Sequence, residues 1–169
     1  MRIVHMLTGV KKMVNRGKDF ESVVRQCFEN VEGTVVIRLH DQTNGFLGSV
    51  NPCDFIVYKY PYFFMVECKS VHGNRLPMSN ITKNQLSELS KSSNIPGVNA
   101  GILCWWVDRD VTKWIDIRHI QHEIKDNKKS IPYDVEDSNL IHSIPGKKLR
   151  VFFNYDFSDF LNGNKNDIR

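Results

Sequence analysis

Two β-rich runs lie close together in the middle of this sequence of 169 residues, and they constrain the fold more than any other feature. The first run spans 53–58 (CDFIVY), the second spans 62–69 (YFFMVECK), and three residues separate them. Aromatic and β-branched residues with so short a connection predict two antiparallel strands joined as a hairpin. Because the second run should be buried, its charged residues Glu67 and Lys69 need specific partners.

The segments on either side of the hairpin predict the rest of a mixed α/β fold. Each expected helix has apolar residues at helical spacing, and each expected strand is rich in β-branched or aromatic residues. The helices are expected over 17–30, from a cap at Ser79 or Asn80 to about Ser90, over 117–125 and near 157–161, and the further strands over 34–39, 98–107 and 149–153. A helix, three strands, a helix and a strand in this order predict a mixed β-sheet flanked by helices.

Length and composition indicate one compact domain. An apolar content of 41% in 169 residues suffices for a core without disulfide bonds. We therefore expect a single domain over 1–161, followed by a flexible C-terminal tail over 162–169 (NGNKNDIR).

The charge and the cysteines indicate the surroundings in which such a chain works. A formal net charge of +4 and a pI near 8.9 favour a polyanionic partner. Four cysteines without a C-x-x-C pair predict free thiols in a reducing cytoplasm rather than a zinc site. No apolar run approaches the length of about eighteen residues that suggests a membrane span, and no secretion signal is recognisable.

Two carboxylates of the hairpin are placed to meet at one end of the sheet. Asp54 begins the first strand and Glu67 lies near the end of the second, so an antiparallel hairpin brings them together. Glu67 and Lys69 share one face of the strand, while Cys68 turns to the other and can offer its backbone carbonyl. Oxygen ligands of this kind suit Mg²⁺ or Mn²⁺. The pattern predicts metal-dependent phosphodiester hydrolysis, with Lys69 positioning water and Glu21 of the first helix assisting, and structural ion pairs are the alternative.

Five motifs resemble, in the same order, the RecU family of Holliday junction resolvases: GKDFE, PCDF, VECKS, LPMSNITKNQLSEL and KKSIPY. The resemblance runs from about Asn15 to about Leu161. It implies a nuclease of the PD-(D/E)xK superfamily with a restriction-endonuclease-like fold and Mg²⁺ as its ion, for which we expect Mn²⁺ to substitute. It also implies a homodimer that nicks two opposing strands of a four-way DNA junction during recombination or repair, in a bacterial or phage-infected cell.

Matched residue by residue, the resemblance implies a catalytic set of Glu21, Asp54, Glu67 and Lys69. Asp54, Glu67 and the backbone carbonyl of Cys68 would bind the metal, with Glu21 as a further candidate. Gln85 matches the glutamine that the family places beside the site. The residues expected to bind DNA flank the site segments and are Arg16, Lys18, Arg38, Arg75, Lys83 and Gln85.

The interval 40–52 departs from the family. It is short and holds no lysine or arginine, whereas family members carry a longer basic insertion there. Two other interpretations therefore stay open. One is a nuclease of the same superfamily that acts on another DNA substrate by nicking, restriction-like or exonucleolytic cleavage. The other is a catalytically silent DNA-binding module.

Overall fold

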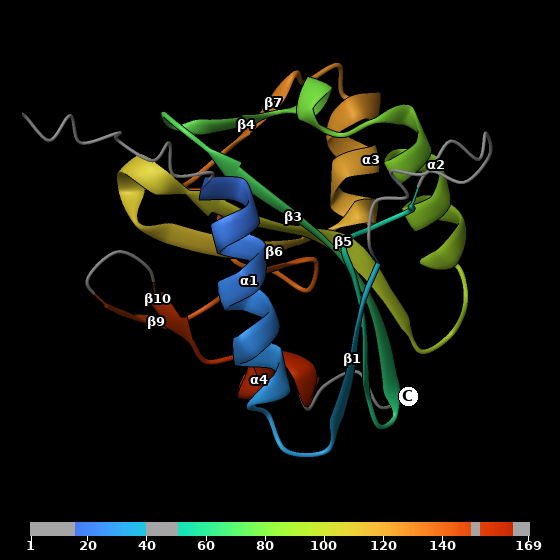
Figure 1. The fold of residues 1–169 in the computed structure, drawn as a ribbon. Coiled ribbons are helices and arrows are strands. Elements are labelled where there is room, and N and C mark those ends of the chain that lie inside the picture. The colour runs from blue at the N-terminus through green and yellow to red at the C-terminus, as the bar shows by residue number, and fades with distance from the viewer. Residues whose placement is uncertain (1–15, 40–50, 150–152, 164–169) are drawn as a thin grey trace, which may run out of the picture.

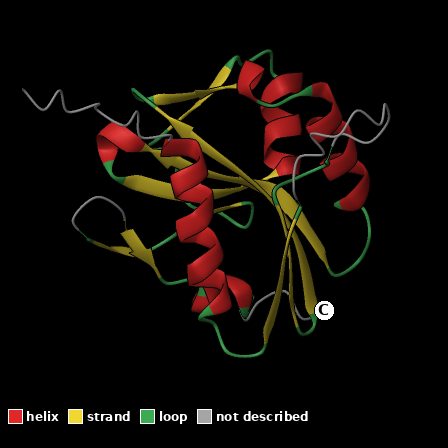
Figure 2. Ribbon diagram, viewed as in Figure 1, coloured by secondary structure: helices red, strands yellow, loops and turns green. Residues whose placement is uncertain are grey.

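A six-stranded mixed β-sheet forms the centre of the structure (Figures 1 and 2). The structure is a computed structural model and describes residues 16–39, 51–149 and 153–163. The strand order is β1–β2–β3–β5–β6–β8, in which β3 and β5 are parallel and the other neighbours are antiparallel. The bounds are β1 Thr34–Arg38, β2 Phe55–Lys59, β3 Tyr62–Val71, β5 Val98–Trp106, β6 Val111–Asp116 and β8 Ile141–Ser143.

Two small sheets and the helices surround this central sheet. The small sheets are antiparallel pairs of β4 Arg75–Pro77 with β7 Ser130–Pro132, and of β9 Gly146–Lys148 with β10 Phe153–Tyr155. The α-helices are α1 Arg16–Glu29, α2 Lys83–Ser92, α3 Ile117–Lys125 and α4 Ser158–Leu161, and two 3-10 turns are η1 Met78–Asn80 and η2 Val107–Arg109. No described helix is long and apolar enough to cross a membrane.

Helices cover both faces of the central sheet, as Figure 2 shows. On one face, α1 and α4 pack through residues that include Phe20, Phe28 and Leu161. On the other face, α2 and α3 contribute Leu89 and Ile120 to a second apolar cluster. Strand β3 lies between both clusters because its side chains alternate across the sheet. The predicted α/β class, a mixed sheet flanked by helices, is confirmed.

Most predicted elements are present, with ends that differ by at most two residues from the prediction. These are α1, β1, β2, β3, β5, α3 and α4. β4, β6, β7, β8 and β9 were not predicted from the sequence. Most of the interval 40–52 and residues 164–169 of the expected tail lie outside the described part of the chain.

Two predictions were wrong in detail. The cap of α2 is Thr82, not Ser79 or Asn80, because Thr82 and the glutamine three residues later form a reciprocal capping box. Of the expected strand over 149–153, residues 150–152 lie outside the described part of the chain. The described exposed residue Leu149 lies outside any strand, and β10 begins only at Phe153.

Candidate active site

Asp54 is fixed at the point where the hairpin joins the edge strand. Its N–H donates to the carbonyl of Val66 on β3 (3.1 Å), and its carbonyl accepts from the N–H of Leu39 beside β1 (2.9 Å). The pairing of β2 with β3 ends at Phe55 and Val66, so the N–H of Cys68 lies beyond the ladder. The carboxylate of Asp54 is the acceptor for this N–H in place of a strand carbonyl, because Asp54 Oδ2 accepts from the Cys68 N–H at 2.7 Å.

The Cys68 carbonyl lies on the same side of β3 as the Asp54 carboxylate. In a β-strand, the N–H and the C=O of one residue point to the same side. Since the Cys68 N–H meets the Asp54 carboxylate past the last ladder pair, the carbonyl is on that side as well. This supports the expectation that the carbonyl of Cys68 and the carboxylate of Asp54 can face one ion.

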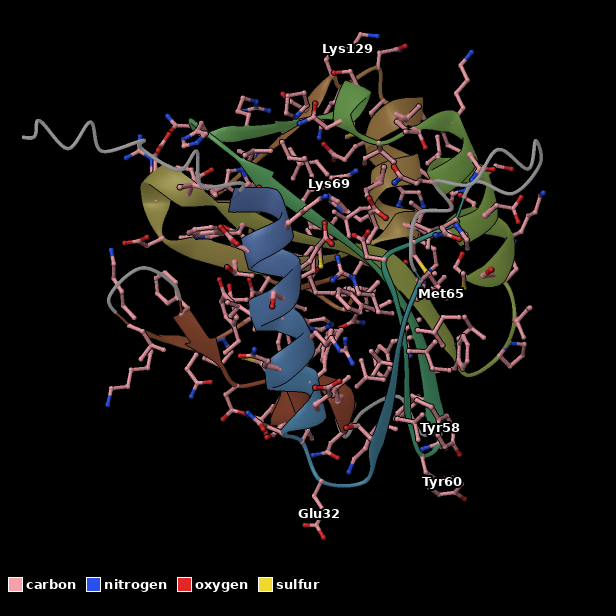
Figure 3. The ribbon with its side chains drawn as sticks, viewed as in Figure 1. Glu32, Tyr58, Tyr60, Met65, Lys69 and Lys129 are labelled. Atoms are coloured by element: carbon pink, nitrogen blue, oxygen red, sulfur yellow. The ribbon has the colours of Figure 1, made fainter. Side chains whose placement is uncertain are left out.

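Glu67 is the buried carboxylate of the site, with 5% of its surface exposed. One oxygen, Oε1, accepts from the Nζ of Lys69 at 2.8 Å and from the Nε2 of Gln85 at 2.6 Å. Figure 3 shows Lys69 in the upper part of the molecule, on β3. Within the described residues, Glu67 Oε2 and Asp54 Oδ1 have no hydrogen-bond donor, so each carboxylate keeps one oxygen for a ligand.

The start of α2 determines the orientation of the Gln85 amide. Thr82 Oγ1 accepts from the Gln85 N–H (3.2 Å), and Gln85 Oε1 accepts from the Thr82 N–H (3.0 Å). Because the amide oxygen is used in this capping box, the amide nitrogen is directed to Glu67. The sequence analysis did not identify Thr82 as part of the site, although the spacing T-x-x-Q was a visible signal for it.

Glu21 approaches the carboxylates from α1. Its Oε2 accepts from Arg38 Nη2 of β1 at 2.6 Å. Its negative charge is close enough to raise the pKa of both Asp54 and Glu67. Glu21 nevertheless does not complete a ligand group, because no set of three Asp, Glu, His or Cys side chains among the described residues is arranged to hold a metal.

The electrostatics of the site favour a bound cation. Burial raises the pKa of Asp54 most, and the charges of Glu67 and Glu21 raise it further, to about 7, against the opposing effects of the Cys68 N–H and Lys69. Burial also raises the pKa of Glu67, although Lys69 and Gln85 oppose this. Two carboxylate oxygens and one carbonyl are an all-oxygen donor set that fits Mg²⁺ or Mn²⁺, with water or phosphate oxygens completing the shell.

The residues expected to bind DNA lie on several elements of the structure. Arg38 is ion-paired with Glu21, and Gln85 is directed at Glu67. Lys18, Arg75 and Lys83 are exposed on three separate elements, α1, β4 and α2. The side chain of Arg16 lies outside the described part of the structure.

The chain has a weak likeness to solved structures, among them the following one. The chain is similar to Hjc of Archaeoglobus fulgidus, a Holliday junction resolvase from an archaeal hyperthermophile, over 61% of this chain and 74% of that chain. The sequence identity is 15% and the TM-score is 0.45, so the likeness carries no argument about chemistry. No protein-family profile and no curated protein sequence matches the chain.

Proposed function

We propose that this chain is a Mg²⁺-dependent DNA endonuclease of the PD-(D/E)xK superfamily that resolves four-way junctions as a homodimer, as its resemblance to the RecU family implies. The observation that carries the proposal is a pair of carboxylates, the half-buried Asp54 and the buried Glu67, with Lys69 bound to Glu67 near the end of β3. Buried carboxylates that repel each other are unfavourable unless a cation or a proton compensates them. The order of α1, the three strands β1–β2–β3, the short strand β4, α2 and β5 supports a restriction-endonuclease-like fold.

Asp54 Oδ1, Glu67 Oε2 and the Cys68 carbonyl are the groups that would hold the metal. A divalent ion bound there would neutralise charge on the scissile phosphate and make a water molecule more acidic. Asp54 is kept in place by the Cys68 N–H, and Glu67 by Lys69 and Gln85. The residues of the site are therefore oriented before any substrate arrives, which is the condition for effective electrostatic stabilisation.

Lys69 has the donors to act on the nucleophile. An ammonium group has three N–H donors, and one of them binds Glu67 Oε1. The remaining donors can position the attacking water and offset the negative charge that develops on the phosphate, an effect of about 3 kcal/mol in comparable sites. Gln85 supplies a second donor to the same Glu67 oxygen, so the orientation of Glu67 does not depend on Lys69 alone.

A different DNA substrate is the second candidate function. The interval 40–52 contains no lysine or arginine. A short neutral or acidic connection between β1 and β2 is a poor candidate for a basic element that enters a junction. A nicking, restriction-like or exonucleolytic enzyme would use the same residues Asp54, Glu67 and Lys69.

A cleavage assay on four labelled substrates tests the proposal. The protein is incubated with Mg²⁺ and a four-way junction, a flap, a duplex or a single strand of DNA, and the products are mapped. Paired symmetric nicks in the junction alone are expected. Cleavage of duplex or flap DNA at an equal rate would favour the second candidate, and binding without cleavage of any substrate would favour a catalytically silent module.

A further inference from the structure

Two arginines outside the active site differ from the other described arginines in their partners. The structure describes the side chains of five arginines, and three of these bind carboxylates, in the pairs Arg25–Glu29, Arg38–Glu21 and Arg118–Asp116. The remaining two, Arg75 and Arg109, are exposed and are held by neutral groups. Both guanidinium groups are therefore held in place without an ion pair to a described carboxylate.

Arg75 lies on β4 and is bound to the neighbouring strand β7. Its Nε donates to Ser130 Oγ at 2.6 Å, and its Nη2 donates to the Ser130 carbonyl at 3.0 Å. A guanidinium has five N–H donors, so three remain for another ligand. Because both bonds hold one edge of the planar group, the opposite edge is presented in a fixed orientation.

Arg109 lies beside the end of the β4–β7 pair at which β4 begins and β7 ends. Its Nε donates to Asn74 Oδ1 at 2.6 Å, and its guanidinium carbon lies 5.2 Å from the centre of the Tyr133 ring. The N–H of Tyr133 donates to the Asn74 carbonyl (2.9 Å), so both contacts of Arg109 are parts of one hydrogen-bonded unit. Four N–H groups of Arg109 remain for a ligand.

The carboxylates next to Arg109 in sequence form no ion pair with it among the described residues, and both bind other groups. Asp108 accepts from the Gly73 N–H at 2.6 Å and lies 2.9 Å from a ring nitrogen of His72. Asp110 is ion-paired with Lys148. The surface around Arg75 and Arg109 therefore keeps exposed donors for an anion.

We call β4, β7 and the adjacent residues Arg109 and Lys129 the β4–β7 ribbon. Leu76 and Ile131, one from each strand, are fully buried and fix the ribbon to the core. The Lys129 carbonyl accepts from the Met78 N–H at 2.9 Å, while its side chain is exposed and lies at the top of Figure 3. The ribbon is a rigid support for three cations.

In the sequence, β4 of the ribbon comes directly after β3, the strand that holds the active site. Lys69 and Arg75 are six residues apart, so their Cα atoms are separated by at most about 20 Å. Duplex DNA rises about 3.4 Å per base pair, so this distance corresponds to about six base pairs. Figure 3 shows Lys69 below the ribbon, on the side of the molecule where Lys129 lies.

We propose that the β4–β7 ribbon binds the DNA backbone within about six base pairs of the scissile phosphate, through Arg75, Arg109 and Lys129. The inference rests on the proposed function for the identity of the polyanion. Arginines held by neutral partners suit this task, because the planar fork matches two phosphate oxygens and nothing has to be displaced. The ribbon positions the DNA and reads no sequence.

The test measures DNA binding in EDTA, without cleavage. Fluorescence anisotropy measures binding to a labelled four-way junction and to a labelled duplex. The salt concentration is varied between about 50 and 300 mM, a range over which the Debye length shortens. The variants are Arg75→Gln, Arg109→Gln and the exposed Lys129→Gln. Arg25→Gln on α1 is the matched control, because it removes the same charge from an ion pair. Thermal unfolding verifies that each variant is folded.

Each ribbon variant is expected to reduce the slope of log K against log salt by about 0.9 and to weaken binding about eightfold at 0.1 M salt. Arg25→Gln should leave the slope unchanged. If all three ribbon variants bind as Arg25→Gln does, the ribbon is not on the DNA path. That failure is distinct from failure of the proposed function, in which the unmodified protein binds DNA but cleaves none with Mg²⁺.

Discussion

Replacing Asp54 by asparagine should stabilise the protein when divalent metal ions are absent. Burial, with the charges of Glu67 and Glu21, raises the pKa of Asp54 to about 7 from an ordinary value of 3.8. Because the pKa of Asp54 is higher in the folded state than in the unfolded state, the protonated carboxyl contributes its full stability to the folded protein below about pH 4. This contribution to the free energy of unfolding is lost as the pH rises through 7. At about 1.4 kcal/mol for each tenfold change in proton affinity, the ionised carboxylate costs up to about 4 kcal/mol at pH 8. Asparagine removes this charge and keeps an oxygen for the Cys68 N–H.

Urea unfolding in EDTA at pH 5 and pH 8 measures this effect. The advantage of Asp54→Asn over the unmodified protein should grow by about 2 to 3 kcal/mol between the two pH values. Added Mg²⁺ should stabilise the unmodified protein and not the variant, because a ligand stabilises only the folded state that binds it. Asp134→Asn, which removes an exposed carboxylate, is the control and should show neither effect. The reasoning is refuted if Asp54→Asn is less stable than the unmodified protein at pH 8 in EDTA, or if Mg²⁺ stabilises both equally.

Three further predictions concern turnover, the start of α2 and assembly. Lys69→Ala should lower the cleavage rate by a factor on the order of 10² to 10³, with the half-saturating Mg²⁺ concentration unchanged in a metal titration; a large rise in that concentration would place Lys69 in metal binding instead. Thr82→Ala should lower the free energy of unfolding by about 1 kcal/mol in urea unfolding, because the Gln85 N–H loses its acceptor Thr82 Oγ1, while Thr82→Ser should preserve the stability. The half-saturating Mg²⁺ concentration should stay unchanged in Thr82→Ala, because Gln85 Oε1 keeps the Thr82 N–H as its donor; a large rise in that concentration would contradict this. Sedimentation should show a homodimer, since two opposed nicks need two sites related by a two-fold axis, and a strict monomer with and without DNA would contradict the resolvase assignment.

The central hairpin could be predicted because its pattern is local. The two β-rich runs and their short connection fix the register roughly, and strand alternation alone places Glu67 and Lys69 on one face. The contact between Glu67 and Gln85 could be expected only through the family resemblance, because the two residues are 18 positions apart on different elements. The cap at Thr82 was missed although its signal, a glutamine three residues later, is in the sequence.

The elements that were missed depend on contacts between distant residues. β6 contains Lys113 and Asp116, charged residues that argue against a buried strand, yet both are buried in the structure. Lys113 is compensated by the Val135 carbonyl at 2.8 Å and by Asp137 at 2.9 Å, partners that no local pattern reveals.

The same limit applies to the charged surface. Arg38 looked available for DNA but is paired with Glu21 across α1 and β1. Arg109 was not among the residues predicted to bind DNA, and its partners, Asn74 and Tyr133, are distant in the sequence. Whether a cation is neutralised depends on tertiary packing, which a single sequence does not display.

The most direct test of the metal-dependent nuclease is the cleavage rate against Mg²⁺ concentration for the unmodified protein, Asp54→Asn and Glu67→Gln, beside DNA affinity in EDTA. Each substitution keeps the size of the side chain and removes one anionic ligand. We expect cleavage by the unmodified protein alone, with DNA affinity nearly equal in all three proteins, and partial rescue of the variants by Mn²⁺. Cleavage by both variants at the unmodified rate would contradict it, because the metal centre would then lie elsewhere.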